Sequence, residues 1–201
     1  MTDPAGTTVT FWFDPLCPAT WATSQWLRDV APQRAAEIDW RVMSLAILNE
    51  DQETSERQRD AVARSWRPIR VLAAARDAHG ASATGRLYTA FGVERHDRRR
   101  PVDDDLLTGA LSAADLPTEL VGAADDPTWN DVVRVSHREG QQRVGMDSGS
   151  PIIAVGTGTA FFGPVVAPVP TGESALDLWD ALTAASKVPQ LSEIKRGRGL
   201  L

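Results

Sequence analysis

The chain has 201 residues, 42% of them hydrophobic, and a formal net charge of -6. This length is sufficient for one sizeable hydrophobic core, with or without an inserted helical segment. The excess of negative charge argues against a protein that binds nucleic acid or an anionic membrane surface, because like charges repel. No run of about 20 apolar residues is present, so we expect no transmembrane segment.

The cysteine content and the N-terminus predict the compartment. The single cysteine excludes a disulfide within the chain. Residues 1–10 are small and polar, with neither the basic start nor the apolar core of a secretory signal peptide. We therefore expect a protein of the reducing cytoplasm.

The first elements in chain order are a predicted strand and a predicted helix. Residues 8–13 (TVTFWF) are mostly β-branched or aromatic, which predicts a buried strand that ends at Asp14-Pro15. Pro18 suits the first position of a helix, where its missing N–H costs no hydrogen bond. Apolar residues at helical spacing continue this helix, which we expect to end before Pro32.

Residues 38–48 predict a second strand. Ile38, Trp40 and Val42 alternate with charged residues, which is the period-two pattern of a strand. A helical crossover is the usual connection between parallel strands. The first part of the chain therefore predicts a β-α-β unit.

The middle of the chain, residues 52–145, predicts helices with no strand between them. An apolar stripe around Trp66 predicts a helix that Pro68 should kink or break. Further helix signals follow at Tyr88, at Asp103 and at Asp126-Pro127. A block of this length is too long for a structureless loop, so we expect an inserted helical subdomain.

The last part of the chain changes character. Residues 152–155 predict a strand, a tight turn follows, and residues 159–162 predict its antiparallel partner. Thr171 is expected to cap a final helix. The order is therefore β-α-β, helical block, β-β-α. It predicts an α/β fold with a core made from residues 1–51 and 146–201, into which residues 52–145 are inserted.

Cys17 is the main candidate for chemistry. It follows a strand and precedes Pro18 at a predicted helix start. A helix N-terminus offers unpaired N–H groups and a positive dipole end, and both stabilise a thiolate. A lone cysteine is otherwise a small buried apolar residue, but this position favours a reactive thiol.

Thr20 stands where the second cysteine of a C-x-x-C pair would lie. Without that cysteine, a mixed disulfide at Cys17 must be resolved by an external thiol. The Thr20 hydroxyl either donates a hydrogen bond to the Cys17 thiolate or bonds the helix backbone. The sequence leaves both partners open.

Ser150-Pro151 precedes the third predicted strand, and the predicted topology brings it opposite Cys17. A cis bond there would turn the Ser150 backbone toward the thiol, where an extended substrate can pair with it. An ordinary trans proline that opens a strand is the alternative, and trans is the commoner form.

His96 and Trp21 each have a candidate functional role and a purely structural alternative. His96 lies in the charged run 94–100 (ERHDRRR), which is typical of a solvated connector, unless the helical block folds over Cys17 and supplies a proton donor. Trp21 either walls a substrate groove or packs beneath it. No residue lies at a metal-like spacing from Cys17, so we expect no metal site.

Four stretches of the sequence resemble one family. They are residues 11–18 (FWFDPLCP), 43–50 (MSLAILNE), 87–90 (LYTA) followed by His96, and 160–165 (AFFGPV). They resemble the actinobacterial mycothiol-dependent reductases of the disulfide-oxidoreductase A (DsbA) family, and the resemblance runs over nearly the whole chain. It departs at residues 17–21, which read Cys-Pro-Ala-Thr-Trp where the family has Cys-Pro-Trp-Cys-Trp.

The resemblance implies a thioredoxin-like α/β fold with a helical insertion subdomain, a nucleophilic Cys17 and a cis proline at Pro151. It implies mycothiol or a similar low-molecular-weight thiol as co-substrate, with no tightly bound cofactor, and disulfides or some nitro compounds as substrates. Beside Cys17 and Thr20, the expected thiol- and substrate-binding residues are Pro18, Trp21, Asn49, His96, Ser150 and Pro151.

Three functions follow from these features. The first is a monothiol oxidoreductase that acts through Cys17 and depends on mycothiol. The second is a thiol transferase or isomerase, because Thr20 beside a solitary thiol distantly resembles the one-hydroxyl arrangement of kappa-class glutathione transferases. The third is a binding module that has lost catalysis. The first two predict a small-molecule thiol and a small-molecule or disulfide substrate as partners, and the third predicts a peptide or a small molecule. The sequence leaves open whether the chain forms a homodimer.

Overall fold

The computed structural model of the protein describes residues 6–50 and 56–197. The strands are β1 (Thr7–Phe13), β2 (Ala36–Val42), β3 (Ile152–Val155) and β4 (Phe161–Phe162). The helices are α1 (Pro18–Gln33), α2 (Leu45–Leu48), α3 (Glu56–Gly92), the π-helical turn η1 (Val93–Asp97), α4 (Asp104–Ala113), the 3-10 helix η2 (Thr118–Asp125), α5 (Trp129–Val144) and α6 (Glu173–Ala185).

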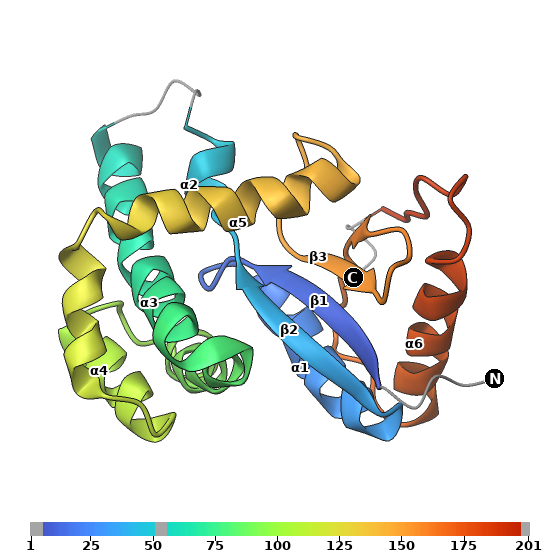
Figure 1. The fold of residues 1–201 in the computed structure, drawn as a ribbon, viewed down its shortest axis with the longest axis horizontal. Coiled ribbons are helices and arrows are strands. Elements are labelled where there is room, and N and C mark those ends of the chain that lie inside the picture. Colours follow the sequence, from blue (N-terminus) through green and yellow to red (C-terminus); the bar gives the residue numbers. More distant parts are fainter. Residues whose placement is uncertain (1–5, 51–55, 198–201) are drawn as a thin grey trace.

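The strands form one sheet in the order β2-β1-β3-β4. β1 lies parallel to β2, from Thr7 opposite Ala36 to Phe13 opposite Val42. β3 is antiparallel to both β1 and β4. The expected β-α-β and β-β-α order is thereby confirmed, and β1 is an inner strand whose end carries the chain into α1 (Figure 1).

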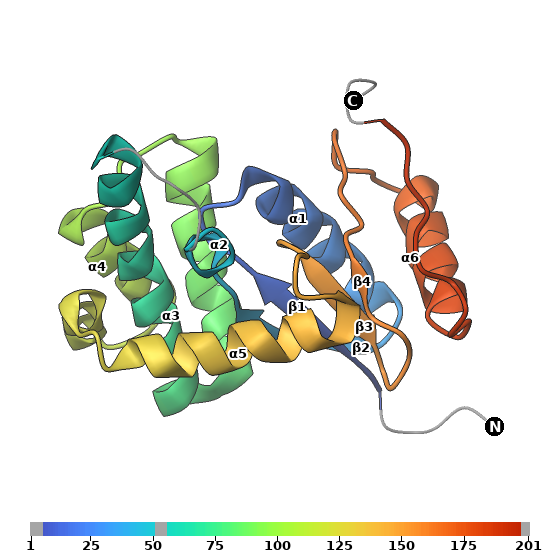
Figure 2. The same ribbon diagram turned by 90° about the horizontal axis from the view of Figure 1, so that it is seen from above.

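The two faces of the sheet are covered by different helices, as α1 and α5 on its opposite sides show (Figure 2). Val9, Phe11 and Phe13 belong to the larger buried cluster, together with residues of α1 and α3. Trp12 belongs to a second cluster, and its ring lies against Gly140 of α5. This alternation along β1 follows the period of a strand.

The break in the long helix falls at a different residue from the one expected. α3 continues through Pro68 and departs from helical geometry at Gly80, with φ 80° and ψ -178°. A proline removes one hydrogen bond but keeps a helical φ, whereas a positive φ is adopted readily only by glycine. The separate helix expected around Tyr88 is the second half of α3.

Two boundaries near the site also differ from expectation. α1 includes Pro32 and ends at Gln33, since a proline in the last turn disturbs little of the helix. β2 ends at Val42, and the segment predicted as its continuation forms α2 instead. The side chain of Ser44 caps this short helix by accepting a hydrogen bond from the Ala46 N–H at 3.2 Å.

The remaining element starts are confirmed in part. Asp103 caps α4 with its side chain as expected. Asp126 bonds the N–H of Thr128, which is the residue that precedes α5. Gly172, rather than Thr171, precedes α6, and β4 is shorter than the predicted strand.

Some expectations lie beyond what the structure tests. The expected boundary between residues 51 and 52, and residues 1–5 of the N-terminal stretch, lie outside the described residues. Within ranges 6–50 and 56–197, none of the helices combines the length and apolar character needed to cross a membrane.

The contact between α1 and the end of α3 yields a stability prediction. A Cβ at Gly92 would lie 2.1 Å from Cζ3 of the Trp21 ring. We expect Gly92→Ala to lower the free energy of unfolding by about 1–3 kcal/mol, because the ring must move. Gly109→Ala in α4 is the matched control: its Cβ has nothing within 4 Å, so it should stabilise the protein by about 0.5–1 kcal/mol. Urea unfolding measures both, and equal effects would contradict this packing.

Candidate active site

The thiol lies where β1 passes into α1. Cys17 is the residue before the first turn of α1, and Pro18 occupies that first turn. The Cys17 side chain is half-buried, and its N–H donates to the Asp14 carbonyl oxygen at 3.1 Å. The strand end therefore presents a partly accessible sulfur at the N-terminus of α1.

The loop before β3 lies opposite this thiol. The Ser150-Pro151 bond is cis, as the resemblance implied. The Cys17 Sγ lies 3.9 Å from the Ser150 carbonyl oxygen, which accepts its hydrogen bond. Residues that are 133 positions apart in the sequence thus form one site, because β3 pairs with β1.

The Thr20 hydroxyl has a different partner from both that were expected. Thr20 is fully buried, and its Oγ1 lies 2.7 Å from Ser150 Oγ. The hydroxyl at the position of the missing cysteine therefore bonds the loop opposite, and neither the thiol nor the helix backbone. It joins α1 to the residue before Pro151.

Asp14 is a site residue that the sequence analysis treated only as a strand breaker. Its carboxylate is 3% exposed and accepts hydrogen bonds from the N–H groups of Leu16, at 2.8 Å, and Leu45, at 2.7 Å. Its own N–H donates to Ser150 Oγ at 2.8 Å. The signal that could have identified it is a carboxylate directly after the buried aromatic run of β1.

Burial makes the charge on Asp14 costly. Desolvation raises the pKa of this carboxyl from its usual value of 3.8 to about 6, although the hydrogen bonds from Leu45 and Leu16 act in the opposite direction. Asp14 is therefore ionised at neutral pH and takes up a proton in mildly acidic solution.

His96 is brought to the thiol loop. It lies in η1, half-buried, and its Nε2 donates to the Pro15 carbonyl oxygen at 2.9 Å. Its ring stacks on Trp21 with 5.7 Å between centroids. Burial lowers the pKa of His96, so the neutral form prevails at neutral pH. The alternative of a fully solvated connector is wrong for this residue.

Trp21 packs beneath the site. It is 4% exposed, and its Nε1 donates to Asp97 Oδ1 at 2.9 Å. The Arg28 guanidinium lies 4.9 Å from its ring centroid. Of the two expected roles, a packing residue fits this burial and a groove wall does not.

Asn49 lies on the segment that follows β2. It ends α2, and its Nδ2 donates to the Leu45 carbonyl oxygen at 2.7 Å. Leu45 is also the residue whose N–H bonds Asp14. The same short helix therefore carries Asn49 and is attached to the strand end that leads to Cys17.

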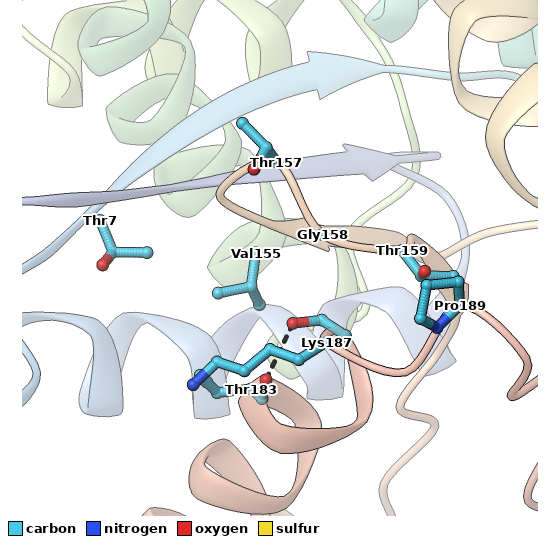
Figure 3. A pocket seen from close by; sticks show the side chains of 9 residues that line it. Thr7, Val155, Thr157, Gly158, Thr159, Thr183, Lys187 and Pro189 are labelled. Atoms are coloured by element: carbon cyan, nitrogen blue, oxygen red, sulfur yellow. Dashed lines mark hydrogen bonds between the residues drawn. The ribbon is translucent and has the colours of Figure 1, made fainter.

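Neither of two surface hollows contains the predicted site residues. One of about 510 Å³ lies between the start of β1, the turn after β3 and the end of α6, lined by hydroxyl side chains and Lys187 (Figure 3). Another of about 1000 Å³ lies between α1, β2 and the second half of α3. Across the described ranges, no three His, Cys, Asp or Glu side chains are grouped to hold a metal ion.

Comparison with known proteins places the chain in a family. Residues 16–196 match the Rv2466c-like family model, described as mycothiol-dependent nitroreductase Rv2466c. The chain belongs to the Rv2466c-like family. It is also 34% identical over 192 residues to the uncharacterized protein Rv2286c of Mycobacterium tuberculosis, and the match covers 94% of this chain and 82% of that protein. As a member of this family, it is a thiol-dependent oxidoreductase or thiol transferase.

Solved structures share the fold of this Rv2466c-like protein. A probable DsbA oxidoreductase, SCO1869 of Streptomyces coelicolor, has a TM-score of 0.61 at 18% identity, covering 94% of this chain and 93% of that chain. DsbA of Chlamydia trachomatis has a TM-score of 0.62 at 11% identity, covering 94% and 92%. A 2-hydroxychromene-2-carboxylate isomerase has a TM-score of 0.60 at 14% identity, covering 88% and 94%. The thioredoxin-like fold with a helical insertion is thus common to oxidoreductases and an isomerase.

The buried bond between Thr20 and Ser150 can be tested by substitution. Thr20→Val keeps the shape but leaves the Ser150 hydroxyl without this partner, so we expect a loss of about 1–3 kcal/mol in the free energy of unfolding. Thr20→Ser keeps the hydroxyl and is the control. Denaturant unfolding measures both, and a valine variant as stable as the wild type would contradict the bond's contribution.

The raised pKa of Asp14 predicts a pH dependence of stability. The folded protein holds this proton more tightly than the unfolded chain, so the contribution is fully present below about pH 3.8 and is lost as the pH rises through about 6. Each unit of pKa difference corresponds to about 1.4 kcal/mol. We expect the wild type to lose roughly 2.4 kcal/mol relative to Asp14→Asn between pH 4 and pH 7.

The difference in free energy of unfolding between the wild type and Asp14→Asn does not contain the contributions of His96 and His137, whose pKa values burial lowers. Urea unfolding of both proteins at a series of pH values measures this difference. A difference that stays constant with pH would show that Asp14 titrates as it does in the unfolded chain.

Proposed function

We propose that this protein is a monothiol oxidoreductase, in which Cys17 exchanges with disulfides and an external low-molecular-weight thiol completes the cycle. The observation that carries the proposal is the local arrangement of Cys17 and Thr20. The chain has one cysteine, and the hydroxyl at the position of a second one is buried and bonded to Ser150. Exchange through an internal disulfide is excluded by this composition.

Mycothiol is the proposed co-substrate. The matched family is described as mycothiol-dependent, and the Cys17 thiol is partly exposed. Ala19, next to the thiol, is a small side chain and is not fully buried. We propose that the enzyme works in the cytoplasm, because its cycle consumes reduced thiol.

The proposed cycle has two exchange steps. In the first, the Cys17 thiolate attacks the mycothiol sulfur of a mixed disulfide between mycothiol and the substrate. The bond between the two sulfurs of that disulfide breaks, a disulfide forms between Cys17 and mycothiol, and the substrate half leaves as a thiolate. In the second, a mycothiol thiolate attacks the mycothiol sulfur of this adduct. Oxidised mycothiol is released, the Cys17 thiolate is restored, and the two electrons pass to the disulfide substrate.

The chain itself supplies three contributions to these steps. The start of α1 holds Cys17 beside the N–H groups of its first turn. The Ser150 backbone beside the cis bond faces the sulfur and offers an extended disulfide substrate a polar edge. Neutral His96 holds the Pro15 carbonyl and so fixes the loop that precedes the thiol.

The test is the intact mass of the protein after incubation with oxidised mycothiol. We expect one adduct per chain on the wild type, its release by added mycothiol, and no adduct on Cys17→Ser. Thr20→Ser is the matched control, because it alters the neighbouring hydroxyl residue and keeps the thiol. An adduct on Cys17→Ser, or none on the wild type, would refute the proposal.

The second candidate, a thiol transferase, is tested by incubating the same variants with reduced mycothiol and an electrophile. A transferase adds mycothiol to an electrophile and produces no oxidised mycothiol. The arrangement suggested for it, in which the Thr20 hydroxyl activates a bound thiol, is not supported, because that hydroxyl is buried against Ser150. A thioether product formed without consumption of disulfide would nevertheless favour this class.

A further inference from the structure

Asp14 connects three segments of the chain that meet at the thiol. One carboxylate oxygen accepts the N–H of Leu16, in the loop that leads to Cys17. The other accepts the N–H of Leu45, at the start of α2. The backbone N–H of Asp14 donates to Ser150, which lies across from the thiol. One buried residue therefore holds the loop, the short helix and the cis-proline segment together.

Burial of the ionised Asp14 carboxylate costs free energy, because the charge loses its hydration. Burial raises the pKa of Asp14 to about 6, so a neutral side chain of similar size would avoid the cost of desolvation at neutral pH. A charged group kept against such a cost is typical of functional sites. What the charge adds locally is strength in two hydrogen bonds, because a charged acceptor binds an N–H more strongly than a neutral one.

We infer that Asp14 is a positioning residue for Cys17, and that its ionised carboxylate fixes the loop at Leu16 and the start of α2 at Leu45 in the arrangement that thiol exchange requires. The inference rests on the proposed function, since it concerns the same thiol. The two hydrogen bonds lower the pKa of Asp14 against the effect of burial, so protonation favours a local opening in which these bonds break while the carboxyl stays out of water. The thiol loop therefore loosens as the pH falls through about 6, although the fold as a whole is more stable when Asp14 is protonated. The site is then best ordered in neutral and alkaline solution.

Other titratable groups also surround Asp14. They come from the elements packed around it, namely Cys17 at the start of α1, Tyr88 of α3, His96 of η1 and His137 of α5. Burial raises the pKa of Tyr88 and keeps it neutral. Burial lowers the pKa of both histidines, which gain charge only in acid. Because histidine and Asp14 titrations overlap, the test compares variants at each pH.

The experiment measures amide hydrogen exchange at Leu16 and Leu45 by NMR on the full chain, corrected for the intrinsic exchange rate at each pH. In the wild type we expect the protection of both amides to fall about fivefold or more between pH 7 and pH 5. In Asp14→Asn the protection of both amides should already be reduced at pH 7 and should not fall further between pH 7 and pH 5. Asp103→Asn is the matched control, because Asp103 also accepts a backbone N–H, at the start of α4, and it should behave as the wild type.

A second measurement links the loop to the chemistry. We expect Asp14→Asn to form the adduct with oxidised mycothiol at least fivefold more slowly than the wild type at pH 7, with Asp103→Asn unchanged. Constant protection of both amides in the wild type from pH 7 to pH 5 would overturn the inference, and this arm needs no variant to fold. The inference would also be overturned if the two amides of Asp14→Asn were as protected as in the wild type while its adduct with oxidised mycothiol formed more slowly, since Asp14 would then act by charge alone.

The inference and the proposed function fail separately. If the wild type forms no adduct but its amides show the pH step, the proposed function is refuted and the positioning of the loop by Asp14 stands. If the adduct forms and the step is absent, the monothiol cycle stands and the role of Asp14 is refuted.

Discussion

The site depends on one hydroxyl, that of Ser150. It accepts the N–H at the end of β1 and lies in hydrogen-bond contact with the Thr20 hydroxyl of α1. These buried contacts hold the residue before the cis bond against the helix that begins beside Cys17, and the Ser150 carbonyl consequently lies 3.9 Å from the sulfur. A buried hydroxyl that loses its partners costs free energy, so the strand end, the helix start and the opposite loop keep one relative arrangement.

This arrangement explains how the fold tolerates the loss of a second sulfur. A hydroxyl at position 20 binds across to Ser150, so it fills a structural role in the core of the site rather than a role in electron transfer. In the proposed cycle the chemistry is concentrated in one half-buried thiol, and turnover requires a second thiol from solution. The family assignment to thiol-dependent enzymes and the structural arrangement of the site are consistent with each other on this point.

Local sequence signals predicted the elements that carry Cys17, because the alternation of apolar residues in strands and a proline at a helix start act over a few residues. The position of the break in the long helix was not predicted correctly. Proline is the usual helix breaker, but α3 continues through Pro68 and departs from helical geometry at Gly80, whose only local signal is the conformational freedom of glycine. His96 reaches the thiol loop through the packing of the whole helical block, which no local pattern encodes. Asp14 was missed for the same reason, since its hydrogen-bond partner on α2 is distant in sequence.

The most direct measurement of the monothiol account is a redox equilibrium between the protein and mixtures of reduced and oxidised mycothiol, with the adduct fraction read by intact mass. The account predicts that the ratio of adduct to unmodified protein is proportional to the first power of the ratio of oxidised to reduced mycothiol, because each exchange consumes one disulfide and releases one thiol. Dependence on the square of the reduced mycothiol concentration, with disulfide-linked protein pairs in place of the adduct, would contradict it.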